Sequence, residues 1–175
     1  AEIVRLTKEM PSLQLHGSTS AGAAPDVREA VAAYIRTAFG VPMSADGVYM
    51  TCGAAASLTI TLNALCEEGD EFVVVTPCFP EYAVFIESAG GKVVRAAAGR
   101  EFHLDMQALD RVIGVHTKGV VINSPNNPTG AVYSEEELAA LAALLTKKSR
   151  EKGAPVFLIS DEPYRELTYG AKVPY

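Results

Sequence analysis

Residues 119–130 read GVVINSPNNPTG, an apolar run that passes directly into a loop dense in turn residues. Runs this apolar usually form strands that are covered on both faces, as in a mostly parallel sheet between helices. The same alternation continues in both directions along the chain. Strands are expected at residues 47–51, 72–76, 93–94, 119–123 and 156–161, and helices at 25–39, 54–66, 79–89, 105–113 and 134–151. The sequence therefore predicts an α/β fold with three layers: helix, mostly parallel sheet, helix.

Two of the expected helices carry clear signals at their ends. Residues 25–39 are amphipathic, with Pro25 in the first turn and Gly40 after the last one. In the helix at 134–151, Ser134 and Glu137 have the spacing of a capping box.

Composition limits the class of protein. The chain has 175 residues, of which 49% are hydrophobic and 21% charged, so we expect one sizeable core rather than disorder. A net charge of -6 without a basic stripe argues against a nucleic-acid partner. The three cysteines include no C-x-x-C pair, so no metal site is predicted and a reducing, cytoplasmic location is expected. No apolar run approaches the roughly 18 residues of a membrane-spanning helix, so no membrane partner is expected.

Ligands of open α/β sheets bind outside the carboxyl ends of the strands, so the segments after each strand are the candidates for chemistry. Four such segments follow the expected strands: residues 51–58, 76–82, 123–130 and 160–164.

The first two segments could hold a phosphate and a planar group. The stretch Gly53-Ala54-Ala55 enters a helix with small side chains, so an anion could approach the backbone N–H groups and the positive end of the helix dipole. The alternative is an ordinary tight turn from strand to helix. Phe79, beside Pro80, could present its ring to a planar ligand, or it could be a core residue.

The last two segments contribute polar groups. Prolines on both sides of the loop fix the direction of the Asn127 amide, which could donate to a phenolate or carboxylate oxygen; the alternative is a tight surface loop. Asp161 follows an apolar run, so its carboxylate needs a partner, either a cationic ligand nitrogen or a helix cap or salt bridge. Tyr164 could direct its hydroxyl into the same crevice or pack as a half-buried core tyrosine.

The motifs S-P-N-N-P-T-G at residues 124–130 and S-D-E-P-Y at 160–164, in this order, resemble those of the class I/II aminotransferases. These are fold-type I enzymes that use pyridoxal 5'-phosphate. The P-C-F-P-E-Y and T-C-G-A-A-A-S-L segments lie where that family has related ones. The resemblance covers roughly residues 24–169 and corresponds to the N-terminal half of the large domain.

The resemblance implies a role for each candidate residue. Gly53, Ala54 and Ala55 would bind the cofactor phosphate, Phe79 would stack on the pyridine ring, Asn127 and Tyr164 would contact its phenolic oxygen, and Asp161 would pair with its nitrogen. A carboxylate beside that nitrogen keeps it protonated, and the cationic ring can then accept electrons from the substrate. Asp161 and Tyr164 are therefore the expected catalytic residues.

The resemblance also implies that this chain is incomplete. The family's Schiff-base lysine lies in a serine-rich context downstream of the S-D-E-x-Y segment, and none of the lysines here has that context. We expect a fragment that is inactive alone, with residues 1–24 belonging to a missing small domain or arm. Residues 25–175 would then form a partial pyridoxal-phosphate-binding large domain.

The expected function is transfer of an amino group between an amino acid and a 2-oxo acid, in a protein that is a homodimer when complete. Two alternatives stay open. Residues that hold the cofactor do not decide which Cα bond breaks, so a pyridoxal-phosphate-dependent lyase fits the same pocket. A non-catalytic, ligand-sensing or structural relative fits as well. A generic doubly wound nucleotide-binding domain fits least, because it predicts a glycine-rich first turn.

Overall fold

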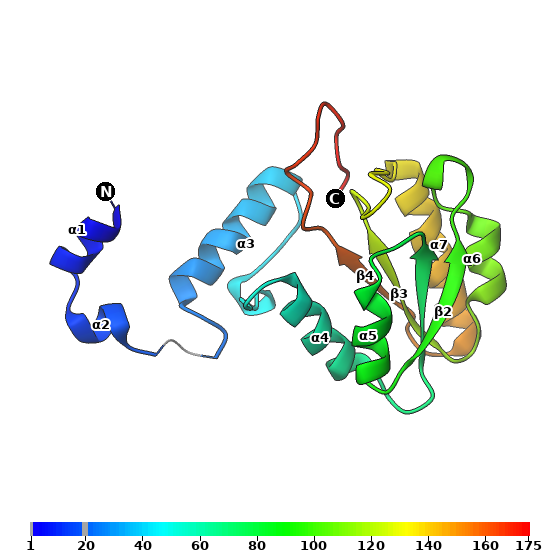
Figure 1. The fold of residues 1–175 in the computed structure, drawn as a ribbon, viewed down its shortest axis with the longest axis horizontal. Helices are drawn as coiled ribbons and strands as arrows, with labels where there is room; N and C mark the ends of the chain where they lie inside the picture. Colours follow the sequence, from blue (N-terminus) through cyan, green and yellow to red (C-terminus); the bar gives the residue numbers. More distant parts are fainter. Residues whose placement is uncertain (1, 19–20) are drawn as a thin grey trace. The chain divides into compact units, whose positions relative to one another are not determined.

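The computed structural model describes residues 2–18 and 21–175 (Figure 1). The chain divides into two compact units, Ala1–Thr51 and Cys52–Tyr175. The boundary expected after residue 24 falls inside the first unit, and residues 1, 19 and 20 of that predicted segment lie outside the described residues. The assignment of residues 1–24 to another domain stays a prediction.

The first unit contains the helices α1 (Glu2–Glu9), α2 (Ser12–His16) and α3 (Pro25–Phe39) and the short 3-10 helix η1 (Ala45–Gly47). The predicted bounds of α3 are confirmed. Gly40 ends this helix in the left-handed conformation, with φ of 70°, and its N–H donates to the Arg36 carbonyl.

The strand predicted at residues 47–51 is wrong. The structure has η1 up to Gly47 and irregular backbone after it, and Tyr49 is 77% exposed. A strand requires a neighbouring strand for its backbone hydrogen bonds, and a short apolar run does not show whether one is available.

The second unit is built on four parallel strands: β1 (Glu71–Thr76), β2 (Lys92–Ala97), β3 (Thr117–Asn123) and β4 (Phe157–Asp161). Their order in the sheet is β2-β1-β3-β4. The last residues of β3 and β4, Asn123 and Asp161, are paired in the register. The carboxyl ends of these two strands therefore lie side by side.

Helices cover both faces of this sheet (Figure 1), with α4 (Ala54–Leu65) and α5 (Glu81–Ser88) on one face and α6 (Met106–Val112) and α7 (Glu135–Lys152) on the other. Alternation along β1 divides the core. Phe72 and Val74 pack in the cluster with α4 and α5, whereas Val73 and Val75 pack in the cluster with α6 and α7. The three-layer α/β prediction is confirmed.

Local sequence fixes the ends of several elements. Ser134 and Glu137 form the predicted capping box at the start of α7, and the Asp105 side chain caps α6. A second 3-10 helix, η2 (Arg100–Phe102), precedes α6. Among the described residues, no helix is both long enough and apolar enough to cross a membrane.

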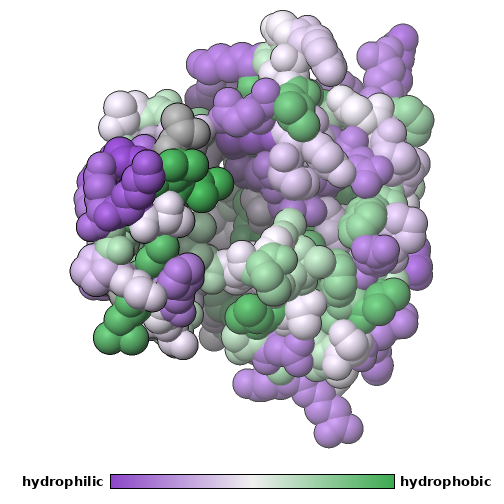
Figure 2. Space-filling view, turned by 60° about the vertical axis from the view of Figure 1, so that its left-hand side comes forward, coloured by the Kyte–Doolittle hydropathy of each residue, from purple (hydrophilic) through white to green (hydrophobic). Residues whose placement is uncertain are grey.

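Apolar side chains also remain at the surface of the second unit. Ile60, Val84 and Leu167 are each more than half exposed. The space-filling view, which draws both units, shows apolar and polar residues interspersed (Figure 2). At the edge of the sheet, Leu158 of β4 is 42% exposed.

Candidate functional site

A cavity of about 190 Å³ lies at the carboxyl ends of β3 and β4. Its lining includes six of the seven predicted site residues: Ala54, Ala55, Phe79, Asn127, Asp161 and Tyr164. The seventh, Gly53, immediately precedes α4. The cavity is smaller than the roughly 300 Å³ at which small-molecule pockets usually begin. Six predicted site residues thus line one small cavity, and their binding roles stay a prediction.

The start of α4 lines this cavity through Ala54 and Ala55. Gly53 has φ of 110° and ψ of 167°, a conformation that only glycine adopts readily, and open space surrounds the position of a Cβ. The N-cap residue of this helix is Gly53, which has no side chain to serve as a cap. Because Ala54 and Ala55 are small and exposed, an anion can reach the N–H groups of the first turn.

Phe79 lies at the boundary between the core and the cavity. Its ring packs against the core cluster beneath α4 and α5 and also lines the cavity. The ring of Tyr82 meets it edge to face, with centroids 5.6 Å apart and an interplanar angle of 82°. This contact holds the Phe79 ring at the cavity wall.

Asp161 is half-buried at the end of β4, and its side chain accepts a hydrogen bond from a neutral phenol. The Tyr82 hydroxyl donates to Asp161 Oδ2 over 2.6 Å. Burial raises the pKa of Asp161, the bond from Tyr82 opposes that rise, and the nearby Glu162 adds to it. Burial, followed by the contact with Asp161, raises the pKa of Tyr82, so this phenol stays a hydrogen-bond donor. The Asp161 carboxylate can therefore still pair with a cation in the cavity.

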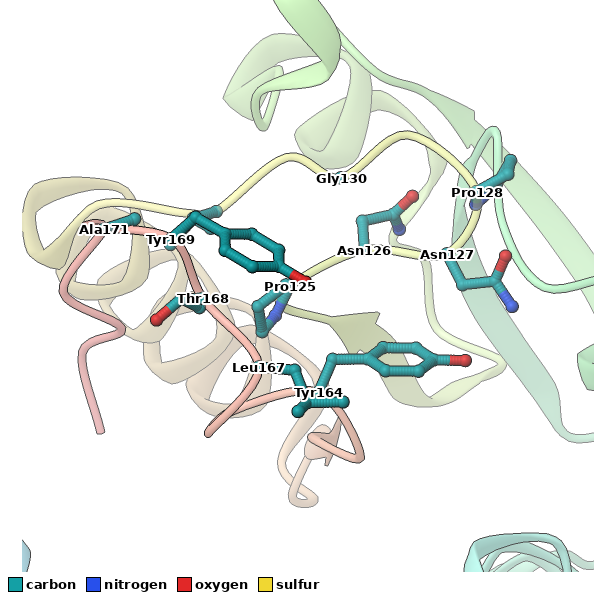
Figure 3. A pocket seen from close by; sticks show the side chains of 11 residues that line it. Pro125, Asn126, Asn127, Pro128, Gly130, Tyr164, Leu167, Thr168, Tyr169 and Ala171 are labelled. Atoms are coloured by element: carbon teal, nitrogen blue, oxygen red, sulfur yellow. The ribbon is translucent and has the colours of Figure 1, made fainter.

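Asn127 and Tyr164 line the same cavity. The backbone N–H of Asn127 donates to Asn123 Oδ1 over 2.6 Å, which ties the loop to the end of β3. Figure 3 shows the side chains of Asn127 and Tyr164 extending in the same direction, away from Tyr169. Tyr164 is 37% exposed, so part of this residue is open to a ligand.

A second, larger cavity of about 450 Å³ adjoins the first one (Figure 3). Asn127 and Tyr164 line both cavities. The remaining wall comes from the loop after β3 and from the segment after Tyr164: Pro125, Asn126, Pro128, Gly130, Val132, Leu167, Thr168, Tyr169 and Ala171.

Sequence reasoning did not predict the lining residues Leu58, Glu81, Asn123 and Pro163, or the contact that Tyr82 makes with Asp161. Tyr82 belongs to the P-C-F-P-E-Y segment, and its buried hydroxyl contacts Asp161. Asn123 is 2% exposed at the end of an apolar strand. The available signal was general: a buried hydroxyl or amide needs a hydrogen-bond partner, but the sequence does not say which one.

Comparisons with known proteins identify the family. The family model described as aminotransferase class I and II matches residues 7–175. The aspartate/prephenate aminotransferase of Thermus thermophilus is 37% identical over 147 residues, which cover 83% of this chain and 37% of that protein. A probable aspartate aminotransferase of Methanocaldococcus jannaschii is 29% identical over 148 residues, covering 85% of this chain and 38% of the relative.

Solved structures agree with this result. An amino transferase from Eubacterium rectale superposes with a TM-score of 0.96 at 48% identity, covering 99% of this chain and 44% of that one. The aspartate aminotransferase from Thermus thermophilus with maleate gives a TM-score of 0.84 at 33% identity, covering 93% and 42% of the two chains. This chain thus spans less than half the length of these relatives. It belongs to the class I and II aminotransferase family and has the fold of the fold-type I enzymes.

Proposed function

We propose that this chain forms the cofactor-binding part of a pyridoxal-phosphate-dependent aminotransferase, which moves an amino group between an amino acid and a 2-oxo acid. The observation that carries the proposal is the half-buried carboxylate of Asp161 in a cavity that Asn127 and Tyr164 also line. The names of the relatives support it, since they are aspartate, prephenate and N-succinyldiaminopimelate aminotransferases.

The chemistry of the side chains around the cavity fits pyridoxal 5'-phosphate. The first turn of α4, from Gly53 to Ala55, would hold the phosphate through backbone N–H groups, because neither alanine has a hydroxyl. Phe79 would cover a face of the pyridine ring. Asn127 and Tyr164 would donate to the phenolic oxygen.

Asp161 would hold a proton at the ring nitrogen. Its carboxylate is half-buried, so its attraction to a cation is stronger there than it would be in water. Tyr82 would keep the carboxylate oriented through its hydrogen bond. When bound, pyridoxal phosphate supplies an electron sink for the bonds at the substrate Cα. We assign no lysine of this chain to the Schiff base or to removal of the Cα proton.

The remaining properties that the family resemblance implies are part of the same proposal. They are amino-acid and 2-oxo-acid substrates, a homodimeric assembly and a cytoplasmic location.

The experiment uses the protein over the full length that its gene encodes, loaded with pyridoxal phosphate. An amino acid labelled with ¹⁵N is supplied with a panel of 2-oxo acids, and the products are followed by mass spectrometry. We expect the label in a new amino acid, at a rate that falls by several orders of magnitude in Asp161→Ala. Glu87→Gln, an exposed change on α5, is the control. Label released as ammonium without transfer would overturn the proposal in favour of a lyase.

A further inference from the structure

Asn123 lies between two of the proposed cofactor contacts. It is the last residue of β3, is 2% exposed, and pairs with Asp161 in the parallel register. Its side-chain Nδ2 donates to the Asp161 carbonyl over 2.8 Å. Its Oδ1 accepts the backbone N–H of Asn127 over 2.6 Å. A single buried amide therefore holds the backbone of both residues.

The loop that carries Asn127 is otherwise closed largely on itself. The Asn126 N–H donates to the Ala131 carbonyl, the Gly130 N–H donates to the Asn126 carbonyl, and Asn126 Oδ1 accepts from Thr129. These bonds shape the turn but do not reach β4. The side chain of Asn123 does reach it, so it links the position of the turn to the strand end that carries Asp161.

The chemistry of the link requires an amide. The site needs one donor, toward a carbonyl, and one acceptor, for an N–H group. Ionised aspartate has the same size but offers only acceptors, and leucine offers neither group. Loss of either bond would leave a buried polar backbone group without this partner.

We propose that Asn123 is a positioning residue that sets the separation of Asn127 and Asp161. It thereby sets how well these two residues fit the phenolic oxygen and the ring nitrogen of the cofactor. Asn123 acts through these two neighbours. This proposal rests on the proposed cofactor site. The experiment must therefore distinguish a protein that does not bind the cofactor from one that binds it without help from Asn123.

Asn123→Asp is the test variant, in the full-length protein, because it keeps the size of the side chain and removes the donor. Thr117→Val is the matched control. Thr117 is fully buried at the opposite end of β3, and its hydroxyl accepts the Gly114 N–H over 2.9 Å. Both variants lose one buried side-chain bond to the backbone on the same strand. Because Asn123→Asp also adds a carboxylate, the uncharged Asn123→Ser is measured with it.

Three quantities are measured for each protein: the dissociation constant of pyridoxal phosphate, the pH midpoint of the visible absorption change of the bound cofactor, and the thermal midpoint. We expect Asn123→Asp to bind at least tenfold more weakly and to shift the pH midpoint. Thr117→Val should keep both values while losing thermal stability. In an Asn127→Ala background, Asn123→Asp should have a smaller effect on the affinity for pyridoxal phosphate, because the effects of substitutions at coupled residues are not additive.

The outcomes separate the two claims. If the unmutated protein does not bind pyridoxal phosphate, the proposed function fails. If it binds, and Asp161→Ala weakens binding, but Asn123→Asp matches the unmutated protein, the role of Asn123 is refuted while the site stands. An equal loss of affinity in Thr117→Val would also refute it, by showing a general effect on folding. If Asn123→Asp does not fold, Asn123→Ser carries the same test with the same thresholds.

Discussion

The Tyr82 hydroxyl donates a hydrogen bond to Asp161 Oδ2 over 2.6 Å and thereby joins the first turn of α5 to the end of β4. Tyr82 is 2% exposed, so little water competes for its hydroxyl. Of the influences on the pKa of Asp161, burial raises it most and the bond from Tyr82 lowers it. Tyr82 therefore favours the ionised carboxylate that the proposed cofactor contact requires.

Tyr82→Phe should raise the pKa of Asp161, because burial then acts without the opposing hydrogen bond. The carboxylate will accept a proton at a higher pH, so the acid limb of cofactor binding should move to higher pH. The lost hydrogen bond to a charged group is worth about 1.5–3 kcal/mol. We therefore also expect Tyr82→Phe to lower the affinity for pyridoxal phosphate by about tenfold or more. Titrations of pyridoxal phosphate binding across pH measure both effects.

Tyr133→Phe is the control for this variant. Tyr133 is 1% exposed and belongs to the core cluster on the other face of the sheet, so the change removes a similarly buried hydroxyl away from Asp161. An acid limb that stays in place in Tyr82→Phe would contradict the role of the hydrogen bond.

Asp161→Asn should stabilise the cofactor-free protein at neutral pH while it abolishes activity. Burial raises the folded-state pKa of Asp161 above its unfolded value. The ionised carboxylate therefore costs stability, and this cost develops as the pH rises from the ordinary pKa through the raised one. Asparagine carries no such cost and can still accept the bond from Tyr82.

Thermal unfolding of the cofactor-free protein as a function of pH measures this difference. We expect a higher thermal midpoint for Asp161→Asn than for the unmutated protein at neutral pH, and a smaller difference in acid. Glu87→Gln, at an exposed site, should change neither the thermal midpoint at neutral pH nor the midpoint in acid. A lower midpoint for Asp161→Asn at neutral pH would mean that its carboxylate stabilises the fold.

Gly53→Ala should weaken both the fold and phosphate binding. A methyl group has room at this position, but φ of 110° with ψ of 167° is strained for any residue with a Cβ. We expect a loss of about 1–3 kcal/mol in the free energy of unfolding, or a shift of the backbone that turns the N–H groups of α4. Denaturant unfolding and pyridoxal phosphate titration measure the two effects.

Gly114→Ala is the matched control, because open space surrounds Gly114 and its φ lies outside the range that disfavours other residues. If Gly53→Ala binds the cofactor as tightly as Gly114→Ala does, the start of α4 does not hold the phosphate.

Glu137→Gln should destabilise the packing of α7 against the segment before α6. The Glu137 carboxylate accepts the N–H groups of Leu104 and Ser134 and lies 3.0 Å from His103 Nδ1. Burial raises the pKa of Glu137, but these contacts outweigh burial and lower it overall. Its contribution should therefore be present above the ordinary glutamate pKa and be lost as the pH falls through the lowered one.

Glutamine keeps one acceptor oxygen but loses the charge and the second acceptor. We therefore expect Glu137→Gln to lower the free energy of unfolding at neutral pH by about 1 kcal/mol, the usual difference between a hydrogen bond to a charged group and one to a neutral group. The difference from the unmutated protein should shrink in acid. Urea unfolding at a series of pH values tests this, with the exposed Glu135→Gln as control. A difference that stays constant with pH would show that the charge of Glu137 is not involved.

The sheet and its helices could be predicted because apolar runs and helix caps are local signals. The Ser134–Glu137 capping box, for example, needs only four consecutive residues. Residues 47–51 gave a similar apolar signal, but no strand forms there, because strand formation depends on a partner elsewhere in the chain.

The gathering of the site residues was predictable for a different reason. The carboxyl ends of parallel strands lie on one side of the sheet, so residues that end or follow strands, such as Asp161 and Asn127, gather there. The contacts that hold them were not predictable. Which group Tyr82 and Asn123 contact depends on the register of β3 and β4 and on the packing of α5, which are properties of the folded chain.

The most direct test of the central proposal is one distance, from the pyridine nitrogen of bound pyridoxal phosphate to the Asp161 carboxylate. It would be measured in a crystal structure of the full-length protein with the cofactor. We predict a charge-assisted hydrogen bond of about 2.7–2.9 Å, with the phosphate at the start of α4 and the phenolic oxygen beside Asn127 and Tyr164. Cofactor bound outside this cavity, or with its ring nitrogen directed away from Asp161, would contradict the proposal.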